Sequence, residues 1–153
     1  MSRPVPELHF KRIFDAPRPL IFSCMIDPQH LTHFWGPVGV RAPLDKIRVD
    51  PRPGGVFETT MINESDGSEY ATYAIYDEVK PPELLVWTEP HTGMRVRAEF
   101  VVIAPERTEV RIHQTSVPEA FLLPEAQAGF LSSLDRFAEY LADCTNQRSN
   151  NDS

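Results

Sequence analysis

The segment from Phe14 to Pro37 constrains the fold most, because it carries the start and stop signals of two short helices in succession. Ala16-Pro17-Arg18-Pro19 places prolines in a first helical turn, where the missing N–H of proline has no intrahelical partner to lose. Asp27-Pro28 repeats the signal, as an N-cap followed by a first helical residue. Gly36-Pro37 then stops the second helix. The first predicted helix ends near Ile26, and the second spans Gln29 to Trp35.

Outside this segment the hydrophobic pattern has a period of two, which is typical of β-strands. On the clearest strand, Val96, Ala98 and Phe100 alternate with polar residues, so that one face is apolar. Gly and Pro residues separate the strands. We expect one strand before the helices and six after them: Glu7 to Asp15, Ile47 to Val49, Phe57 to Met61, Glu69 to Val79, Leu84 to Glu89, Arg95 to Val102 and Thr108 to Gln114.

The last element is predicted to be a long amphipathic helix. Its apolar stripe consists of Phe130, Leu134, Phe137 and Leu141, at spacings of four, three and four residues. A helix of about five turns is long enough to cross a sheet. The residues that follow, 144–153, have little to bury, and we expect them to form a frayed tail.

Three segments together resemble a known family: Phe14 to Pro37, VDPRPGGVFETTM (Val49 to Met61) and DEVKPPELLVWTE (Asp77 to Glu89). They are similar to the Activator of heat-shock-chaperone ATPase homologue, C-terminal-domain-like family, of the START and birch-pollen-allergen-like superfamily (SRPBCC). The resemblance implies an α+β helix-grip fold. In that fold a curved antiparallel sheet of about six to seven strands wraps around a long C-terminal helix, with two short helices after strand one. We expect residues 7–143 to form a single START-like domain.

The resemblance also implies a cavity, since a strongly bent sheet cannot contact a straight helix along its whole length. Strand phase directs aromatic, aliphatic and a few polar side chains toward it, and buried polar groups need a hydrogen-bonding partner, which a ligand can supply. The alternative is that these side chains only fill a core. The predicted ligand-binding residues are Trp35, Phe57, Thr59, Met61, Trp87, Phe100, Val110, Ile112, Gln114, Phe130 and Leu134.

The sequence shows no catalytic constellation. Glu58, Glu78 and Glu99 fall on the outer strand phase, so no carboxylate pair is expected inside for acid–base chemistry. Cys24 lies in an apolar helix without an orienting histidine, so we expect an inert thiol and, with Cys144, a reduced pair of cysteines. The sequence therefore favours a protein without catalytic activity.

No metal or cofactor is expected. His30 and His33 lie one helical turn apart with Asp27 nearby, but Asp27 is more simply the N-cap of the second helix. Gly54-Gly55 is followed by a strand and lacks the lysine of a phosphate-binding loop. We interpret these glycines as a turn or bulge where the chain bends sharply.

Composition excludes several classes of partner. The formal net charge is −7, from 22 acidic and 15 basic residues, which disfavours binding to nucleic acid. The N-terminus lacks the apolar core of a signal peptide, and no apolar run reaches the roughly 18 residues of a membrane span. We therefore expect a cytoplasmic location and no membrane partner.

The favoured function is binding of a small hydrophobic or amphipathic ligand between sheet and C-terminal helix, as a carrier or sensor. Two alternatives stay open. One is a co-chaperone-like activator of a heat-shock chaperone ATPase, which the family resemblance implies. The other is a cyclase or aromatase-like enzyme of the wider superfamily. The expected partners are accordingly a small apolar or amphipathic molecule and, in the first alternative, a chaperone; the chain is expected to be a monomer or a homodimer.

Overall fold

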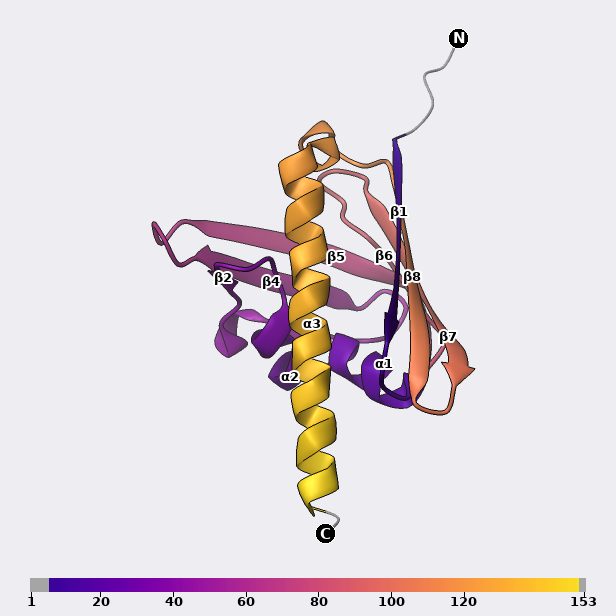
Figure 1. Cartoon of the computed structure of the whole chain (residues 1–153). Coiled ribbons are helices and arrows are strands. Elements are labelled where there is room, and N and C mark those ends of the chain that lie inside the picture. Colours follow the sequence, from indigo (N-terminus) through magenta and orange to yellow (C-terminus); the bar gives the residue numbers. More distant parts are fainter. Residues whose placement is uncertain (1–5, 152–153) are drawn as a thin grey trace.

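A curved antiparallel sheet grips one long helix (Figure 1). The computed structural model describes the backbone of residues 6–151 and the side chains of residues 6–145. The strands are β1 (Glu7–Phe14), β2 (Val40–Arg41), β3 (Arg48–Val49), β4 (Val56–Asn63), β5 (Glu69–Lys80), β6 (Leu84–Thr88), β7 (Arg95–Ala104) and β8 (Arg107–Thr115). Their order is β1-β8-β7-β6-β5-β4-β2, and β3 pairs with β4. The predicted α+β helix-grip fold is confirmed.

The sheet differs from the expectation in one short strand. The described residues form eight strands, and the one that the alternation does not predict is β2, which has only two residues. Between β2 and β3 the chain forms a single 3-10 turn, η1 (Leu44–Lys46). A two-residue strand has no measurable period, so pairing with β4 and not local pattern defines it.

Two helices follow β1 with the predicted signals. Helix α1 (Arg18–Ile26) begins after Pro17. Helix α2 (Pro28–Phe34) is capped by Asp27, whose carboxylate accepts a hydrogen bond from the Gln29 N–H at 2.9 Å. It ends before Gly36, whose φ of +98° continues the chain in a left-handed conformation.

The turn at Gly54-Gly55 has a steric cause. A Cβ atom on Gly55 would lie 2.0 Å from the Asp50 carbonyl oxygen, and Gly54 has a φ of +84°. The Gly54 N–H donates to the Tyr76 carbonyl at 2.8 Å, which ties this turn to β5. The glycines therefore serve the tight turn, as predicted.

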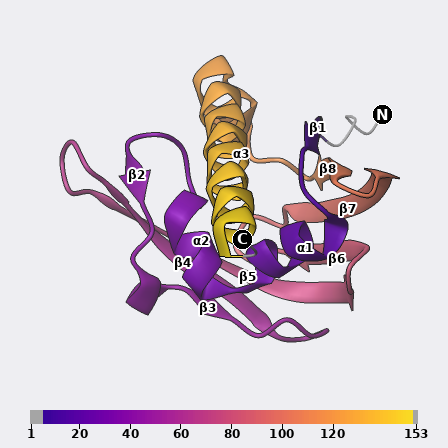
Figure 2. The same cartoon turned by 60° about the horizontal axis from the view of Figure 1, so that its bottom comes forward.

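Helix α3 (Pro124–Asn151) follows the 3-10 helix η2 (Glu119–Leu122) and lies on the concave side of the sheet. Figure 2 shows the sheet curving around α3, with β1 on one side of the helix and β2 on the other. The helical backbone continues to Asn151, into the segment for which the sequence predicts a tail.

Aromatic side chains hold α3 against both α2 and β1. The Phe137 ring stacks on Phe34 of α2 at 4.2 Å and contacts Phe14 of β1 at 5.0 Å. Arg12 of β1 forms an ion pair with Asp135 of α3. The main backbone contacts of α3 are with η2, α2 and β1, so the middle strands of the sheet lie farther from the helix.

Candidate functional site

The space between α3 and the middle of the sheet is a cavity of about 420 Å³. Strands β1 and β4 to β8 form its floor, while α3, η2 and the segment after α2 close it from above. Most of its wall is apolar. The side chains on its wall come from segments far apart in the sequence, which only the closed fold brings together.

Four aromatic rings pack together at one end of the cavity. Phe57 of β4 lies at the centre, with ring centroids 5.1 Å from Trp35, 5.8 Å from Tyr76 and 5.4 Å from Trp87. The Trp87 ring meets Phe57 edge-on at 76°, a favourable arrangement for aromatic pairs. Trp35, Phe57 and Trp87 reach the cavity, whereas Tyr76 is behind them and is 1% exposed.

Helix α3 supplies the opposite wall through the stripe that the sequence predicts. Phe130 packs on Phe10 of β1 with ring centroids 4.4 Å apart, and Leu134 is 8% exposed. Phe130, Leu134 and Phe137 all line the cavity. The same stripe therefore both closes the core and forms the wall of the cavity.

The segment after α2 is held to α3 by a partly buried network of hydrogen bonds. Arg136 of α3 donates from Nη1 to the carbonyl oxygens of Gly36, Pro37 and Val40 at 2.8, 3.0 and 2.9 Å. Ser132 accepts a hydrogen bond from the Val38 N–H at 3.2 Å. Because Gly36 and Pro37 line the cavity, this network fixes part of its wall.

Steric crowding, in addition to the positive φ, explains why residue 36 is a glycine. A Cβ atom there would lie 3.1 Å from the Met61 sulfur and 3.2 Å from a Val40 methyl group. Met61 itself lines the cavity. A side chain at this position would therefore crowd Met61 and Val40 and displace this part of the cavity wall.

Seven polar side chains interrupt the apolar wall: Tyr70, Thr72, Glu89, Gln114, Glu125, Gln127 and Ser133. Burial raises the pKa of the Glu89 carboxyl group above its usual range. Burial, and then the neighbouring Glu89 charge, raise the pKa of Tyr70. Tyr70 is 51% exposed, so this end of the cavity opens to solvent. Gln114, 9% exposed, lies on β8.

Eight of the eleven predicted ligand-binding residues lie on the cavity wall: Trp35, Phe57, Met61, Trp87, Ile112, Gln114, Phe130 and Leu134. Thr59, Phe100 and Val110 are buried but do not line it. The Thr59 hydroxyl lies 2.6 Å from the hydroxyl of Thr72, its cross-strand partner. Thr72, and not Thr59, lines the cavity. Phe100 packs edge-on against Phe22 of α1 at 5.4 Å, in the filled part of the core.

The sequence reasoning missed Glu89. The sequence does indicate that Glu89 faces the cavity, because this residue is two positions beyond Trp87 and shares its strand phase. The residue was assigned to the end of a strand, where phase carries less weight. The hairpin keeps the phase, since the Glu89 N–H donates to the Met94 carbonyl at 2.9 Å and its carbonyl accepts from Gly93 at 2.8 Å.

The residues considered for a metal or a nucleophile have other contacts. His30 Nδ1 lies 2.5 Å from the Tyr140 hydroxyl, and the His33 ring stacks on Tyr140 at 5.1 Å. Cys24 and Cys144 are both free. Burial raises the pKa of the Cys24 thiol to about 12, so it is protonated and unreactive at neutral pH.

Comparison with known proteins places this fold in a family. The profile of the Activator of Hsp90 ATPase homolog 1-like proteins matches residues 15–142. The chain belongs to this family, which confirms the resemblance seen in the sequence. A comparison with curated proteins gave no match.

Solved structures show the same fold at low sequence identity. A crystal structure of a protein from Chromobacterium violaceum has a TM-score of 0.79 at 21% identity, covering 89% of this chain and 97% of the other. The solution structure of the AHSA1-like protein from Aeromonas hydrophila has a TM-score of 0.77 at 19% identity, covering 92% and 94%. The AHSA1 protein from Silicibacter pomeroyi has a TM-score of 0.75 at 21% identity, covering 90% and 98%.

Helix α3 is long but carries many polar residues. Within the part of the chain that the structure describes, no helix combines the length and the apolar character needed to cross a membrane.

Proposed function

We propose that this protein binds a small apolar or amphipathic molecule in the cavity between the sheet and α3, as a carrier or sensor. The cavity itself is the observation that carries the proposal. Its volume of about 420 Å³ falls within the roughly 300 to 1,000 Å³ that is usual for small-molecule sites. Its wall is mostly apolar, and a ligand that covers this wall would remove apolar surface from water, which is favourable.

The wall supports an amphipathic ligand with an apolar body. Phe57, Trp87 and Phe130 offer aromatic surface to that body. Tyr70 and Glu89 stand where the cavity opens, so the polar end of the ligand lies toward them. A group that donates a hydrogen bond suits this end, because a carboxylate accepts hydrogen bonds and a phenol both donates and accepts them.

A matched pair of alanine substitutions tests the proposal. Ala98 on β7 lines the cavity and is 1% exposed, whereas Ala42 is equally buried at 1% but lies away from it. Ala98→Phe fills empty space, so we expect the fold to be kept and binding of hydrophobic fluorophores and fatty acids to be lost. Ala42→Phe adds the same bulk to a filled region and is expected to destabilise by about 1 to 3 kcal/mol.

Binding is measured by fluorescence titration and by the rise in melting temperature that a ligand of the folded state produces. Undiminished binding in a folded Ala98→Phe variant would place the ligand elsewhere. Absence of any shift in wild type, across a panel of lipids and aromatic compounds, would mean that the cavity is not a binding site for these classes.

Glu89 supports a second candidate, a cyclase or aromatase-like enzyme. A carboxyl group with a raised pKa in an apolar site is suited to transfer protons. Such a protein would exchange the proton next to the carbonyl group of a bound ketone for deuterium, which NMR detects in deuterated water. Glu89→Gln would abolish exchange while keeping binding. Exchange that is equal in both proteins would remove Glu89 from the chemistry.

Family membership alone supports a third candidate, activation of a heat-shock chaperone ATPase. The measurement is the ATP turnover of such a chaperone with increasing amounts of this protein. A saturable, several-fold rise would support this candidate. An unchanged rate at saturating protein would leave the small-molecule proposal as the function that the cavity supports.

A further inference from the structure

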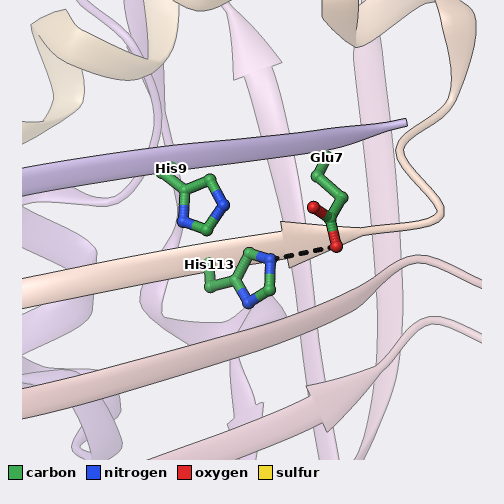
Figure 3. A group of neighbouring side chains, drawn as sticks. All are labelled: Glu7, His9 and His113. Carbon is green, nitrogen blue, oxygen red and sulfur yellow. Dashed lines mark ion pairs between the residues drawn. The ribbon is translucent and has the colours of Figure 1, made fainter. Parts of the chain in front are cut away.

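A cluster of two histidines and a glutamate lies on the outer face of the sheet, away from the cavity. Strand β1 pairs with β8 at the sheet edge, with His9 directly opposite His113. Successive strand residues face opposite sides of a sheet. Leu8 and Gln114 therefore face the cavity, while Glu7, His9 and His113 gather on the other side (Figure 3).

The three side chains are close enough to share one ion. Their nearest ligand atoms all lie within 4.8 Å of one another. The two imidazole rings stack with centroids 4.1 Å apart and planes inclined by 10°. His113 Nε2 lies 3.4 Å from Glu7 Oε1. Figure 3 marks this pair with a dashed line.

His113 Nε2 also lacks a hydrogen bond. The atom is buried, and no partner satisfies it within the described residues, because its contact with Glu7 lacks hydrogen-bond geometry. Buried polar atoms are rarely left in this state without a reason. A ligand atom that faces a carboxylate oxygen and a second imidazole is placed to bind a cation.

We propose that Glu7, His9 and His113 bind a divalent transition metal ion, with Zn²⁺ as the preferred species. Two imidazole nitrogens and one carboxylate oxygen are a donor set that suits Zn²⁺. Bonds of about 2.0 to 2.2 Å place neighbouring ligand atoms about 3 to 4 Å apart. The His113–Glu7 contact already has this spacing, and the exposed His9 ring turns so that its nitrogen joins them.

The surrounding charges permit a cation here. Neutral imidazoles do not repel it, Glu7 is anionic, and the chain has a net charge of −7. The neighbouring cationic side chains on the same face are Lys11 of β1, Arg111 of β8, and Arg95 and Arg97 of β7. Arg111 is paired with Glu109 at 2.5 Å, and Arg95 lies 3.9 Å from Asp77. Arg97 is the register partner of His113, and its guanidinium is engaged with Glu99 at 2.8 Å and with Glu78 at 4.0 Å.

The site leaves coordination positions open to water, since only three protein ligands are present. It lies at the edge strand, on a surface that is separate from the cavity. Metal binding there is independent of the proposed ligand, and the filled variant Ala98→Phe is expected to bind the ion as wild type does.

Calorimetric titration of the untagged full chain with Zn²⁺ tests the proposal. We expect saturation at one ion per chain near pH 7.5, and weaker binding near pH 5.5, where protons compete for the imidazole nitrogens. His9→Ala, His113→Ala and Glu7→Gln are each expected to lower affinity at least about tenfold. His91→Ala removes an exposed histidine from the turn before β7 and serves as the matched control.

NMR detects metal binding independently of the heat signal that calorimetry measures. Zn²⁺ should shift the ring signals of His9 and His113 together at one equivalent, while those of His91 stay unchanged. Circular dichroism checks that each variant is folded, which the exposed or half-buried positions of these side chains favour. Lack of saturable binding by wild type would overturn the proposal, as would equal affinity in wild type and in the folded variants.

Discussion

Glu89 is a carboxyl group on the wall of an apolar cavity, and its environment gives a prediction about pH. Burial raises the pKa of Glu89 in the folded chain above its value in the unfolded chain. The folded state therefore holds the proton more tightly. Ionised Glu89 lowers stability above the folded pKa, and this effect disappears as the pH falls below the unfolded pKa.

Glu89→Gln removes the charge and keeps the shape. We expect it to raise the melting temperature at neutral pH, with the difference from wild type shrinking as the pH falls to about 4. Thermal unfolding of both proteins across that range measures the effect. Glu106→Gln, at an exposed turn, is the control and should change little. A constant difference at every pH would show that ionisation of Glu89 is not the cause.

Individual positions could be predicted where strand phase was clear. Gln114, which strand phase directs inward, is buried. Thr108 at the start of the same predicted strand is buried as well, and its hydroxyl donates to the Ala16 carbonyl at 2.9 Å. Thr59 has the predicted phase but lies off the cavity wall, because phase defines a face of the sheet and not a place along it. The position of α3 over that face decides which inward residues meet the cavity.

At the scale of elements, α3 is fastened by Phe137. This ring is 3% exposed and lies between Phe14 and Phe34. Phe137→Ala is expected to cost about 3 to 5 kcal/mol in the free energy of unfolding, through lost apolar burial and the void that remains. Leu131→Ala, on the same helix but 47% exposed, is the control. A denaturation midpoint of Phe137→Ala close to wild type would show that α3 is peripheral.

Arg136 holds the segment after α2 against α3. Its Nη1 donates to three carbonyl oxygens, so Arg136→Ala removes these three hydrogen bonds, and the Pro37 carbonyl keeps only the one from the Val40 N–H. We expect a loss of about 1.5 to 3 kcal/mol, measured by chemical denaturation. Arg107→Ala breaks an exposed ion pair with Asp15 and is expected to cost less than about 1 kcal/mol. Equal losses in the two variants would contradict the role assigned to Arg136.

Most elements could be predicted because the chain marks their ends. The Pro17 and Asp27 signals start α1 and α2 where the structure has them. Strand β2 could not be predicted, since it exists through pairing with β4. Helix α3 extends past the last residue of its apolar stripe, where the sequence carries no Gly or Pro to stop it.

The whole molecule explains why the cavity exists. The curved sheet contacts α3 along β1, and α2 supports the helix from the other side, so the middle strands stay apart from it. The same architecture recurs in structures that share about a fifth of their sequence with this chain. The scaffold is thus shared, while the side chains on the wall are those of this protein and decide what it binds.

The outer histidine cluster shows what sequence alone could not supply. His9 and His113 are about a hundred residues apart, and nothing local indicates that they face each other. The pairing register of β1 with β8 brings them together. His30 and His33, by contrast, are near in sequence, yet their side chains contact Tyr140. Spacing along a helix was therefore a poorer indicator than register across strands.

Native mass spectrometry tests the central claim most directly, on protein purified gently from the cells that make it. We predict a bound small molecule at one per chain, of a size that fits about 420 Å³, which is released on unfolding and is absent from folded Ala98→Phe. Ala42→Phe, where it folds, should keep the molecule. A spectrum of the bare chain, together with no binding from an added lipid and aromatic panel, would contradict the account.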